Sequence, residues 1–517
     1  MALASGRVAV VARALRRRGA PSAARGLASR AHDPDAEVFE SADEHRAFLA
    51  TRAALPDGFR TATASFPFEP VELARGKKTR MSLTAIVLDE PTEAFAGVFT
   101  QNAFPGHPVR VGRRRLKEEA LSAIVINNKI SNVGAPGGEA DSEAVCAAFA
   151  HEMGSGDGTS VIPCSTGIIG WRLPVDDMTA AIPALVDELQ GGTGLPLAMG
   201  IMTTDMYPKL RSVTLEPAAE GEPPVRVMGV AKGAGMVEPN LATMLVYILT
   251  DADISREQLR AALPAAAHSS FNCLSVDGDQ STSDTLIAAA SGRRRLPGAT
   301  DEERAAAFQS ALQEVCDALS MDVVRNGEGV QHVMRVNVLG AATEPLARRI
   351  GKKLVNSLLV KTAVAGNDPN VGRLVMAVGN GLSEAAAAGD QIDTEAITSR
   401  MRISVGGCVL FEDGKFVIDG SVEKEVHDHL MKAWLWESVP QITSTPVPVD
   451  TSVGDESRPP AWFVRGNGVS YQVPVDFPRH QRCVEIEVDL ASGEETCTVL
   501  GNDLTHEYVS VNADYRS

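Results

Sequence analysis

The stretch KGAGMVEPNLATMLVYILTDA, residues 232–252, decides how this chain is organised. Two glycines, Pro239 and Asn240 form a turn-like cluster, and an unbroken apolar run from Met244 to Leu249 follows. Clusters of Gly, Pro and Asn mark turns, and short apolar runs bounded by such turns are typical of buried strands. The pattern therefore predicts a turn that delivers Thr243 to the head of a buried strand.

Such a layout suits a threonine whose hydroxyl attacks its own preceding peptide bond. Cleavage between Ala242 and Thr243 would leave Thr243 as a new N-terminal residue, whose freed α-amine can act as the general base for its own hydroxyl. The alternative interpretation of the same residues is an ordinary loop-to-strand turn. Composition alone leaves both interpretations open.

The run KGAGM, followed by PNLATML and a TDA end, resembles the processing site of the ornithine acetyltransferase family. This family, also called glutamate N-acetyltransferase, consists of autoprocessed two-chain enzymes of arginine biosynthesis. The resemblance extends over residues 61–433 and 483–517. Two positions of the turn depart from it, because Ala234 stands where members often have Ser and Glu238 where many have His.

The resemblance implies an α/β fold of two domains, with mixed sheets layered with helices, of the autoprocessed N-terminal-nucleophile type. Self-cleavage would give a light chain, residues 33–242, and a heavy chain, residues 243–517, assembled as a heterotetramer of two light and two heavy chains. The residue pattern by itself supports only α/β or α+β.

Roles for individual residues follow from the same resemblance. Thr243 is the implied nucleophile, and Thr166 with Gly167, inside the motif CSTGIIG, is the implied pair that stabilises the oxyanion. The implied substrate-binding residues are Thr203, Lys232, Thr243, Glu328, Asn512 and Ser517. Asp205, two residues after Thr203, is expected to support its loop. Neither a metal nor a bound cofactor is implied.

The implied reaction is a ping-pong transfer of acetyl from N-acetylornithine to Thr243 and then to glutamate. The products are ornithine and N-acetylglutamate. The sequence leaves open whether acetyl-CoA is a second donor. The alternatives are a related self-processed amidohydrolase or aminopeptidase, with water as the acceptor, and an uncleaved binding protein.

The charge distribution bears on partners and location. The net charge is −17, although the first thirty residues contain seven arginines and no acidic residue. An acidic body repels polyanions, which argues against nucleic acid as a partner. No stretch approaches the ~20 apolar residues that span a bilayer, so no membrane partner is expected. Residues 1–32, rich in Ala, Ser and Arg, predict an organelle transit peptide, for the mitochondrial matrix or alternatively the chloroplast.

Other patterns are structural expectations. Residues 437–481 contain several prolines, with Trp436 just before them and Trp462 among them, which predicts an insertion relative to compact family members. The seven cysteines are scattered without a CxxC pair, which predicts neither disulfides nor a zinc site. The segment SVDGDQSTSD, residues 275–284, lacks the spacing of a calcium loop and is interpreted as a tight turn. Helices are expected over 302–323 and over 142–153, the latter capped by Ser142.

Overall fold

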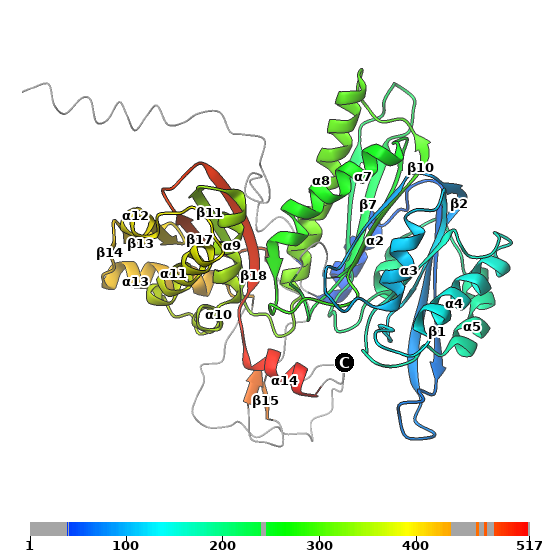
Figure 1. Ribbon diagram of the computed structural model, residues 1–517, viewed down its shortest axis with the longest axis horizontal. Helices are drawn as coiled ribbons and strands as arrows, with labels where there is room; N and C mark the ends of the chain where they lie inside the picture. The colour runs from blue at the N-terminus through cyan, green and yellow to red at the C-terminus, as the bar shows by residue number, and fades with distance from the viewer. Residues whose placement is uncertain are drawn as a thin grey trace, which may run out of the picture.

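The computed structural model describes residues 39, 41–238, 244–435, 462–464, 470–472 and 480–514. Ala242, Thr243, Ser517, the predicted transit peptide and most of the predicted insertion lie outside these residues. Figure 1 shows two parts side by side, one coloured blue to green and the other yellow to red. In both views helix α14 (His506–Asp514) lies toward the bottom of the molecule, between the two parts from left to right.

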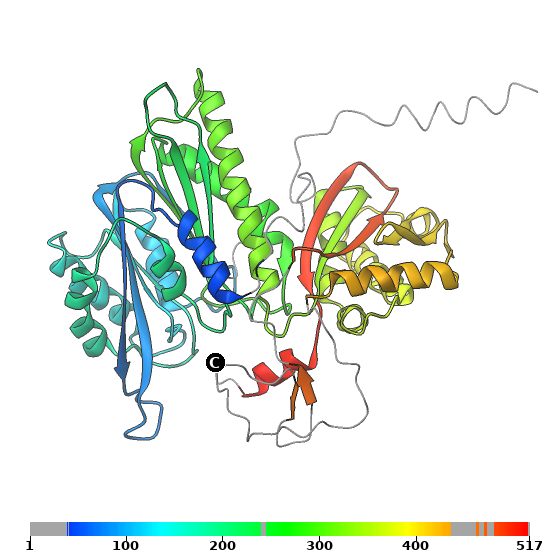
Figure 2. The same ribbon diagram turned by 180° about the vertical axis from the view of Figure 1, so that it is seen from behind.

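The first part contains two sheets. Its strands are β1 (Phe59–Phe68), β2 (Thr79–Thr92), β3 (Phe95–Phe99), β4 (Leu121–Asn127), β5 (Val161–Ser165), β6 (Lys209–Leu215), β7 (Val225–Lys232), β8 (Leu245–Ala252) and β10 (Thr285–Arg294). Its helices are α2 (Ala42–Arg52), α3 (His107–Arg115), α4 (Gly138–Glu152), α5 (Val175–Asp187), α6 (Leu195–Gly200), α7 (Arg256–Ser269) and α8 (Asp301–Arg325). The side of this part that carries α2 faces the viewer in Figure 2.

These elements stack in four layers. A four-stranded sheet, in the order β1-β2-β4-β5, packs on a five-stranded sheet, in the order β3-β10-β8-β7-β6. The core between the sheets joins Ile86 and Ile124 of the first to Tyr247 of the second. Helices α4 and α5 cover the outer face of the first sheet, and α7 and α8 cover the outer face of the second. Apolar residues on both faces of the strands explain why a run such as 244–249 is unbroken.

The second part is built on a seven-stranded sheet in the order β14-β13-β12-β17-β11-β18-β9. Its strands are β9 (Leu274–Ser275), β11 (Val333–Ala341), β12 (Arg402–Val405), β13 (Cys408–Glu412), β14 (Lys415–Phe416), β17 (Val484–Asp489) and β18 (Glu495–Asn502). Its helices are α9 (Glu344–Asn356), α10 (Leu358–Ala365), α11 (Val371–Ala387), α12 (Thr394–Arg400) and α13 (Gly420–Ala433). A separate hairpin pairs β15 (Trp462–Val464) with β16 (Ser470–Gln472).

The prediction of an α/β fold with mixed sheets layered with helices is confirmed. Parallel and antiparallel pairs occur within each of the three large sheets, for example β10 with β8 and β10 with β3. The five-stranded sheet takes β3, β6 and β7 from before Thr243 and β8 and β10 from after it. Cleavage at that position would therefore leave one sheet made of two chains.

Local expectations were met unevenly. The run after Thr243 is the buried strand β8, and the helix expected over 302–323 is α8, which begins at a Thr300 capping box. The cap predicted at Ser142 is wrong. Helix α4 begins four residues earlier, after Gly137, and the Ser142 hydroxyl instead donates to the Gly138 carbonyl inside the helix, 3.0 Å away. A serine inside a helix resembles a cap because it bonds to nearby backbone in both positions.

Candidate functional site

A polar pocket opens where β7 ends and β8 begins. Lys232, the last residue of β7, is paired in the sheet with Leu245, the first residue of β8. The pocket encloses about 740 Å³, including the space at its open mouth. It is lined by Ser131, Thr166, Gly167, Ile169, Thr203, Thr204, Lys232, Gly235, Met236, Met244, Leu245, Ser281, Thr282, Ser283, Asp284, Glu328 and Asn512.

Six of the predicted site residues meet in this pocket. They are Thr166, Gly167, Thr203, Lys232, Glu328 and Asn512. Ala242, Thr243 and Ser517 lie outside the described residues, so their placement stays a prediction. Met244, which follows Thr243 in the chain, lines the pocket. The roles of all these residues remain predictions, but their shared position makes this pocket the candidate active site.

Asp205 organises the cationic wall of the pocket. Its carboxylate accepts hydrogen bonds from the backbone N–H groups of Thr203, at 2.9 Å, and of Gly233, at 2.8 Å. The Lys232 Nζ donates to Thr203 Oγ1 over 3.2 Å. Asp205 thus holds the backbone of Thr203 and of Gly233, the residue that follows Lys232. The expectation that Asp205 supports its loop is confirmed.

Lys209 is a buried partner of Asp205 that the sequence interpretation missed. Its ammonium group pairs with Asp205 and also donates to Asn326 Oδ1, at 2.7 Å. Burial opposes ionisation of Asp205, but the charges of Lys209 and Lys232 lower its pKa well below the ordinary range. Burial lowers the pKa of Lys232, and the Asp205 carboxylate opposes that shift. A Lys four residues after an Asp was the available signal, although that spacing is more often a surface helix pair.

Glu328 forms the anionic wall and touches the turn after β7. Its Oε2 accepts a hydrogen bond from Asn512 Nδ2 at 2.7 Å, and its backbone N–H donates to the Ala234 carbonyl at 2.8 Å. A Cβ atom on Gly235 would lie 2.4 Å from Glu328 Oε2. Glycine at 235 is required for this close approach, since any side chain would push the carboxylate away.

Thr166 and Gly167 directly follow strand β5. The backbone N–H of Thr166 already donates to the Asn127 carbonyl, at 3.1 Å. An oxyanion-binding pair from these residues would therefore consist of the Thr166 hydroxyl and the Gly167 N–H. Gly167 has φ +114°, and a Cβ there would lie 2.3 Å from the Lys129 carbonyl oxygen. Only glycine fits this conformation and this contact.

Several lining residues were not foreseen as part of a site. The segment 275–284, interpreted from sequence as a tight turn, runs from β9 to β10, and Ser281–Asp284 form one wall of the pocket. Hydroxyls and a carboxylate directly ahead of a buried strand were the signal that this segment offered. Ser131 and Thr204 also line the pocket. Within the described ranges, no group of three or more His, Cys, Asp or Glu is arranged to hold a metal ion.

No residue of the segment 361–373 is among those that line this pocket. Lys361 is buried and its Nζ donates to Val276 O at 2.8 Å and to Asn502 O at 2.6 Å. It also donates to Asn502 Oδ1, at 3.1 Å. Burial lowers the pKa of Lys361 to about 8, and the Asp503 carboxylate opposes the shift. Lys361 therefore joins the segment after β9 to the end of β18.

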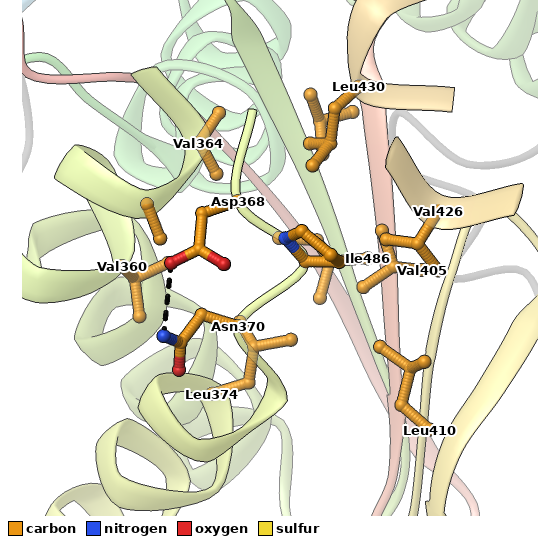
Figure 3. A pocket seen from close by; sticks show the side chains of 13 residues that line it. Val360, Val364, Asp368, Asn370, Leu374, Val405, Leu410, Val426, Leu430 and Ile486 are labelled. Atoms are coloured by element: carbon orange, nitrogen blue, oxygen red, sulfur yellow. Dashed lines mark hydrogen bonds between the residues drawn. The ribbon is translucent and has the colours of Figure 1, made fainter. Parts of the chain in front are cut away.

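A second pocket lies in the C-terminal part (Figure 3), between α10, α11 and α13 and the sheet. It encloses about 330 Å³ and is lined mainly by valine, leucine and isoleucine side chains. Asp368, at its edge, accepts a hydrogen bond from Asn370 at 3.1 Å. Its apolar walls resemble a core gap more than a site for a charged molecule.

Cysteine chemistry is not suggested at the pocket. All seven cysteines are free thiols, and Cys164 is fully buried, which raises its pKa to about 12. Such a thiol is a poor nucleophile. Among the described residues, no helix is long and apolar enough to cross a membrane.

Comparisons with known proteins agree with the sequence resemblance. The sequence model of the ArgJ family matches residues 71–442 and 472–517. The arginine biosynthesis bifunctional protein ArgJ of Brucella melitensis is 34% identical over 447 residues, which cover 85% of this chain and 92% of that protein. The protein of the same description from Methylococcus capsulatus is 43% identical over 291 residues, 55% of this chain and 69% of its own.

Among solved structures, the ornithine acetyltransferase of Mycobacterium tuberculosis, in complex with ornithine, is 32% identical. That alignment covers 37% of this chain and 95% of the other, with a TM-score of 0.31.

The protein is an acyltransferase of arginine biosynthesis. More particularly, the chain belongs to the ArgJ family, and the predicted resemblance to ornithine acetyltransferases is confirmed. The two curated relatives described above are bacterial, so they do not bear on the predicted transit peptide, which stays a prediction. The family match omits residues 443–471, which lie within the predicted insertion.

Proposed function

We propose that this protein cleaves itself between Ala242 and Thr243 and then transfers acetyl from N-acetylornithine to glutamate through an acetyl-Thr243 intermediate. One observation carries the proposal. Lys232, from before the cut, and Glu328, from after it, bring opposite charges to one pocket that Met244 also lines. An amino acid carries both charges, so this pocket suits a zwitterionic substrate.

Self-cleavage begins when the Thr243 hydroxyl attacks the Ala242 carbonyl carbon. The peptide C–N bond breaks as an ester forms, and the proton of the hydroxyl passes to the departing amine. Water then hydrolyses the ester, leaving a carboxylate on Ala242 and a free α-amine and hydroxyl on Thr243. The light chain ends at Ala242 and the heavy chain starts at Thr243.

Acetyl transfer then uses Thr243 twice. Its hydroxyl attacks the acetyl carbonyl of N-acetylornithine, its α-amine takes the proton, and that proton passes to the departing amine of ornithine. Glutamate's amine next attacks the acetyl ester, which gives N-acetylglutamate and restores the hydroxyl. The Thr166 hydroxyl and the Gly167 N–H stabilise the oxyanion of each tetrahedral intermediate.

The remaining pocket residues orient the two substrates. The Lys232 ammonium group pairs with a substrate carboxylate, and the Glu328 carboxylate pairs with a substrate ammonium group. Thr203 and Asn512 already contact these two side chains, at 3.2 and 2.7 Å, and extend the polar walls. Ser517 completes the set by resemblance. No metal or bound cofactor takes part in this scheme, and acetyl-CoA is left as a second donor to be tested.

The test combines a gel with an assay. Purified full-length protein should give two bands, the larger beginning at Thr243 by N-terminal sequencing, whereas Thr243→Ala should give one. The processed protein should form N-acetylglutamate from N-acetylornithine, and assays with acetyl-CoA alone decide whether it is a second donor. Acetate release without N-acetylglutamate would instead indicate an amidohydrolase. A single intact band without transfer activity would contradict the proposal.

The proposal also covers location and assembly. We propose a mitochondrial matrix enzyme on the composition of residues 1–32, with the chloroplast as the alternative outcome of a localisation experiment. A heterotetramer of two light and two heavy chains rests on the family resemblance, and light scattering on the processed protein tests it.

A further inference from the structure

The end of the described segment before the predicted cut is fixed by side chains that follow the cut. Asp277 accepts two hydrogen bonds from the backbone of this segment. Its Oδ2 accepts from the Met236 N–H at 2.6 Å, and its Oδ1 accepts from the Val237 N–H at 2.8 Å. The Val276 N–H also donates to the Val237 carbonyl, at 2.8 Å. The N–H groups of residues 236 and 237 and the carbonyl of residue 237 are thus all bonded to residues 276 and 277.

Glu238, the next residue, is anchored on helix α9. Its carboxylate lies 3.0 Å from Lys352 Nζ and accepts a hydrogen bond from Asn356 Nδ2 at 3.1 Å. The Glu238 and Lys352 side chains are only 22% and 15% exposed, so solvent screens this ion pair weakly. Glu238 departs from the histidine that many family members have, and in this chain the carboxylate has cationic and amide partners positioned for it.

The same helix residues also hold the segment that carries Asp277. Lys352 Nζ donates to the Leu274 carbonyl at 2.5 Å, and Asn356 Oδ1 accepts from Ser275 Oγ at 2.6 Å. Helix α9 therefore fixes the turn at Glu238 and the strand β9 that leads to Asp277. The two anchors share one support.

The geometry of the turn explains why it needs anchoring. Met236 has φ +54°, a left-handed backbone conformation that is unfavourable for residues other than glycine and asparagine. A free peptide of this sequence would leave that conformation. Two charge-assisted hydrogen bonds from consecutive N–H groups to one carboxylate favour it instead.

We propose that Asp277, Lys352 and Asn356 form a clamp on residues 236–238. By holding these residues, the clamp directs the chain that follows, so that the Ala242–Thr243 bond can reach the geometry for self-cleavage. These are positioning residues, because they act on the backbone ahead of the bond. The inference rests on the cleavage proposed above. After cleavage the clamp belongs to the heavy chain and residues 236–238 to the light chain, so the same contacts hold this part of the light chain on the heavy chain.

Cell-free synthesis of the full chain, followed by gels over time, measures the rate at which the precursor converts to two chains. We expect Asp277→Asn to slow conversion about tenfold or more, equivalent to about 1.4 kcal/mol, because an amide cannot accept from both N–H groups. Glu238→Gln should slow it less, since it keeps the Asn356 contact. Lys352→Met combined with Glu238→Gln should be little slower than Lys352→Met alone, because the pair acts as a unit.

The matched control is Lys353→Met on the same helix. Lys353 pairs with Glu384 on α11 instead of the turn, so its removal should leave conversion at the wild-type rate. Melting temperatures measured in a Thr243→Ala background, in which the precursor stays whole, report folding separately from cleavage. Where Asp277→Asn does not fold, Asp277→Glu retains the charge and misplaces it by one methylene, and it should also slow conversion.

The outcomes separate the two proposals. Folded Asp277 and Glu238 variants that convert at the wild-type rate would overturn the clamp and leave self-cleavage intact. Wild-type protein that remains whole, as Thr243→Ala does, would overturn self-cleavage itself.

Discussion

The two pockets of this molecule differ in how their polar groups are used. In the pocket between β7 and β8, Lys232, Asp284 and Glu328 all face a space of about 740 Å³. In the C-terminal pocket the walls are aliphatic, and the Asp368 carboxylate at its edge is bonded to Asn370. Burying opposite charges around an open space is unfavourable for folding alone, so the first pocket is built for a ligand. The second is built for packing.

The first pocket also differs in the origin of its walls. Its lining comes from strands, loops and a helix spread from Ser131 to Asn512, whereas the second pocket is lined within residues 360–486. A pocket shared across the predicted cut depends on both chains remaining together. This dependence is why the contacts that anchor residues 236–238 matter for the site as well as for its formation.

The sharpest test of the comparison is Lys232→Met. Removing the cation leaves a substrate carboxylate without its partner and Asp205 with one cationic neighbour fewer. We expect kcat/KM for acetyl transfer to fall by a factor of about 100, or about 3 kcal/mol of transition-state stabilisation. The measurement uses protein already shown to be cleaved, so that processing and transfer are not confused. A kcat/KM of Lys232→Met equal to that of the wild type would show that Lys232 does not bind the substrate.

Leu430→Ala tests the second pocket with the opposite expectation. Leu430 is 2% exposed and lines the apolar pocket, so truncation enlarges an existing gap. We expect the free energy of unfolding to fall by about 2–3 kcal/mol in urea titrations, with kcat/KM unchanged. A large loss of transfer activity in folded protein would mean that the two pockets are coupled.

The sequence predicted the pocket better than it predicted the supports around it. Thr166, Gly167, Thr203, Lys232, Glu328 and Asn512 were found because short motifs carry a family resemblance. The strand after Thr243 was found because both faces of a central strand are buried, which produces an unbroken apolar run.

The supports were missed for a physical reason. The contacts of Lys209 with Asn326 and of Asp277 with the backbone of residues 236 and 237 form only when distant segments meet. A single charged residue in a loop usually faces solvent. Glu238 looked like an unexplained departure, because its partners Lys352 and Asn356 follow more than a hundred residues later. No local pattern connects such residues, so only the fold reveals them.

Glu328→Gln is expected to have a smaller effect than Lys232→Met. The amide keeps the shape and can still contact Asn512, but it loses the charge that attracts a substrate ammonium group. We expect KM for N-acetylornithine to rise about tenfold, or about 1.4 kcal/mol, with a smaller change in kcat. Glu384→Gln, on the exposed face of α11, is the control. An unchanged KM for Glu328→Gln would exclude the assigned contact and leave Asp284 as the anionic candidate.

The last prediction concerns a residue that supports the polar pocket without lining it, and the expected effect is on stability and depends on pH. Lys361 has a pKa of about 8 in the folded protein, lowered by burial from an ordinary 10.5. Between these values the unfolded chain binds more protons than the folded one, so this group makes unfolding free energy rise as pH rises from about 8 to 10.5. Below pH 8 that contribution is lost, because the folded protein must keep a buried charge.

Lys361→Met removes this dependence, and the comparison with wild type isolates it from other groups that titrate in the same range. We expect the difference in unfolding free energy between the two proteins to change by about 2–3 kcal/mol between pH 7.5 and 10.5. Urea titrations at several pH values provide the measurement. Parallel pH profiles for the two proteins would show that Lys361 has the same pKa in both states, and that its three oxygen partners fully offset its burial.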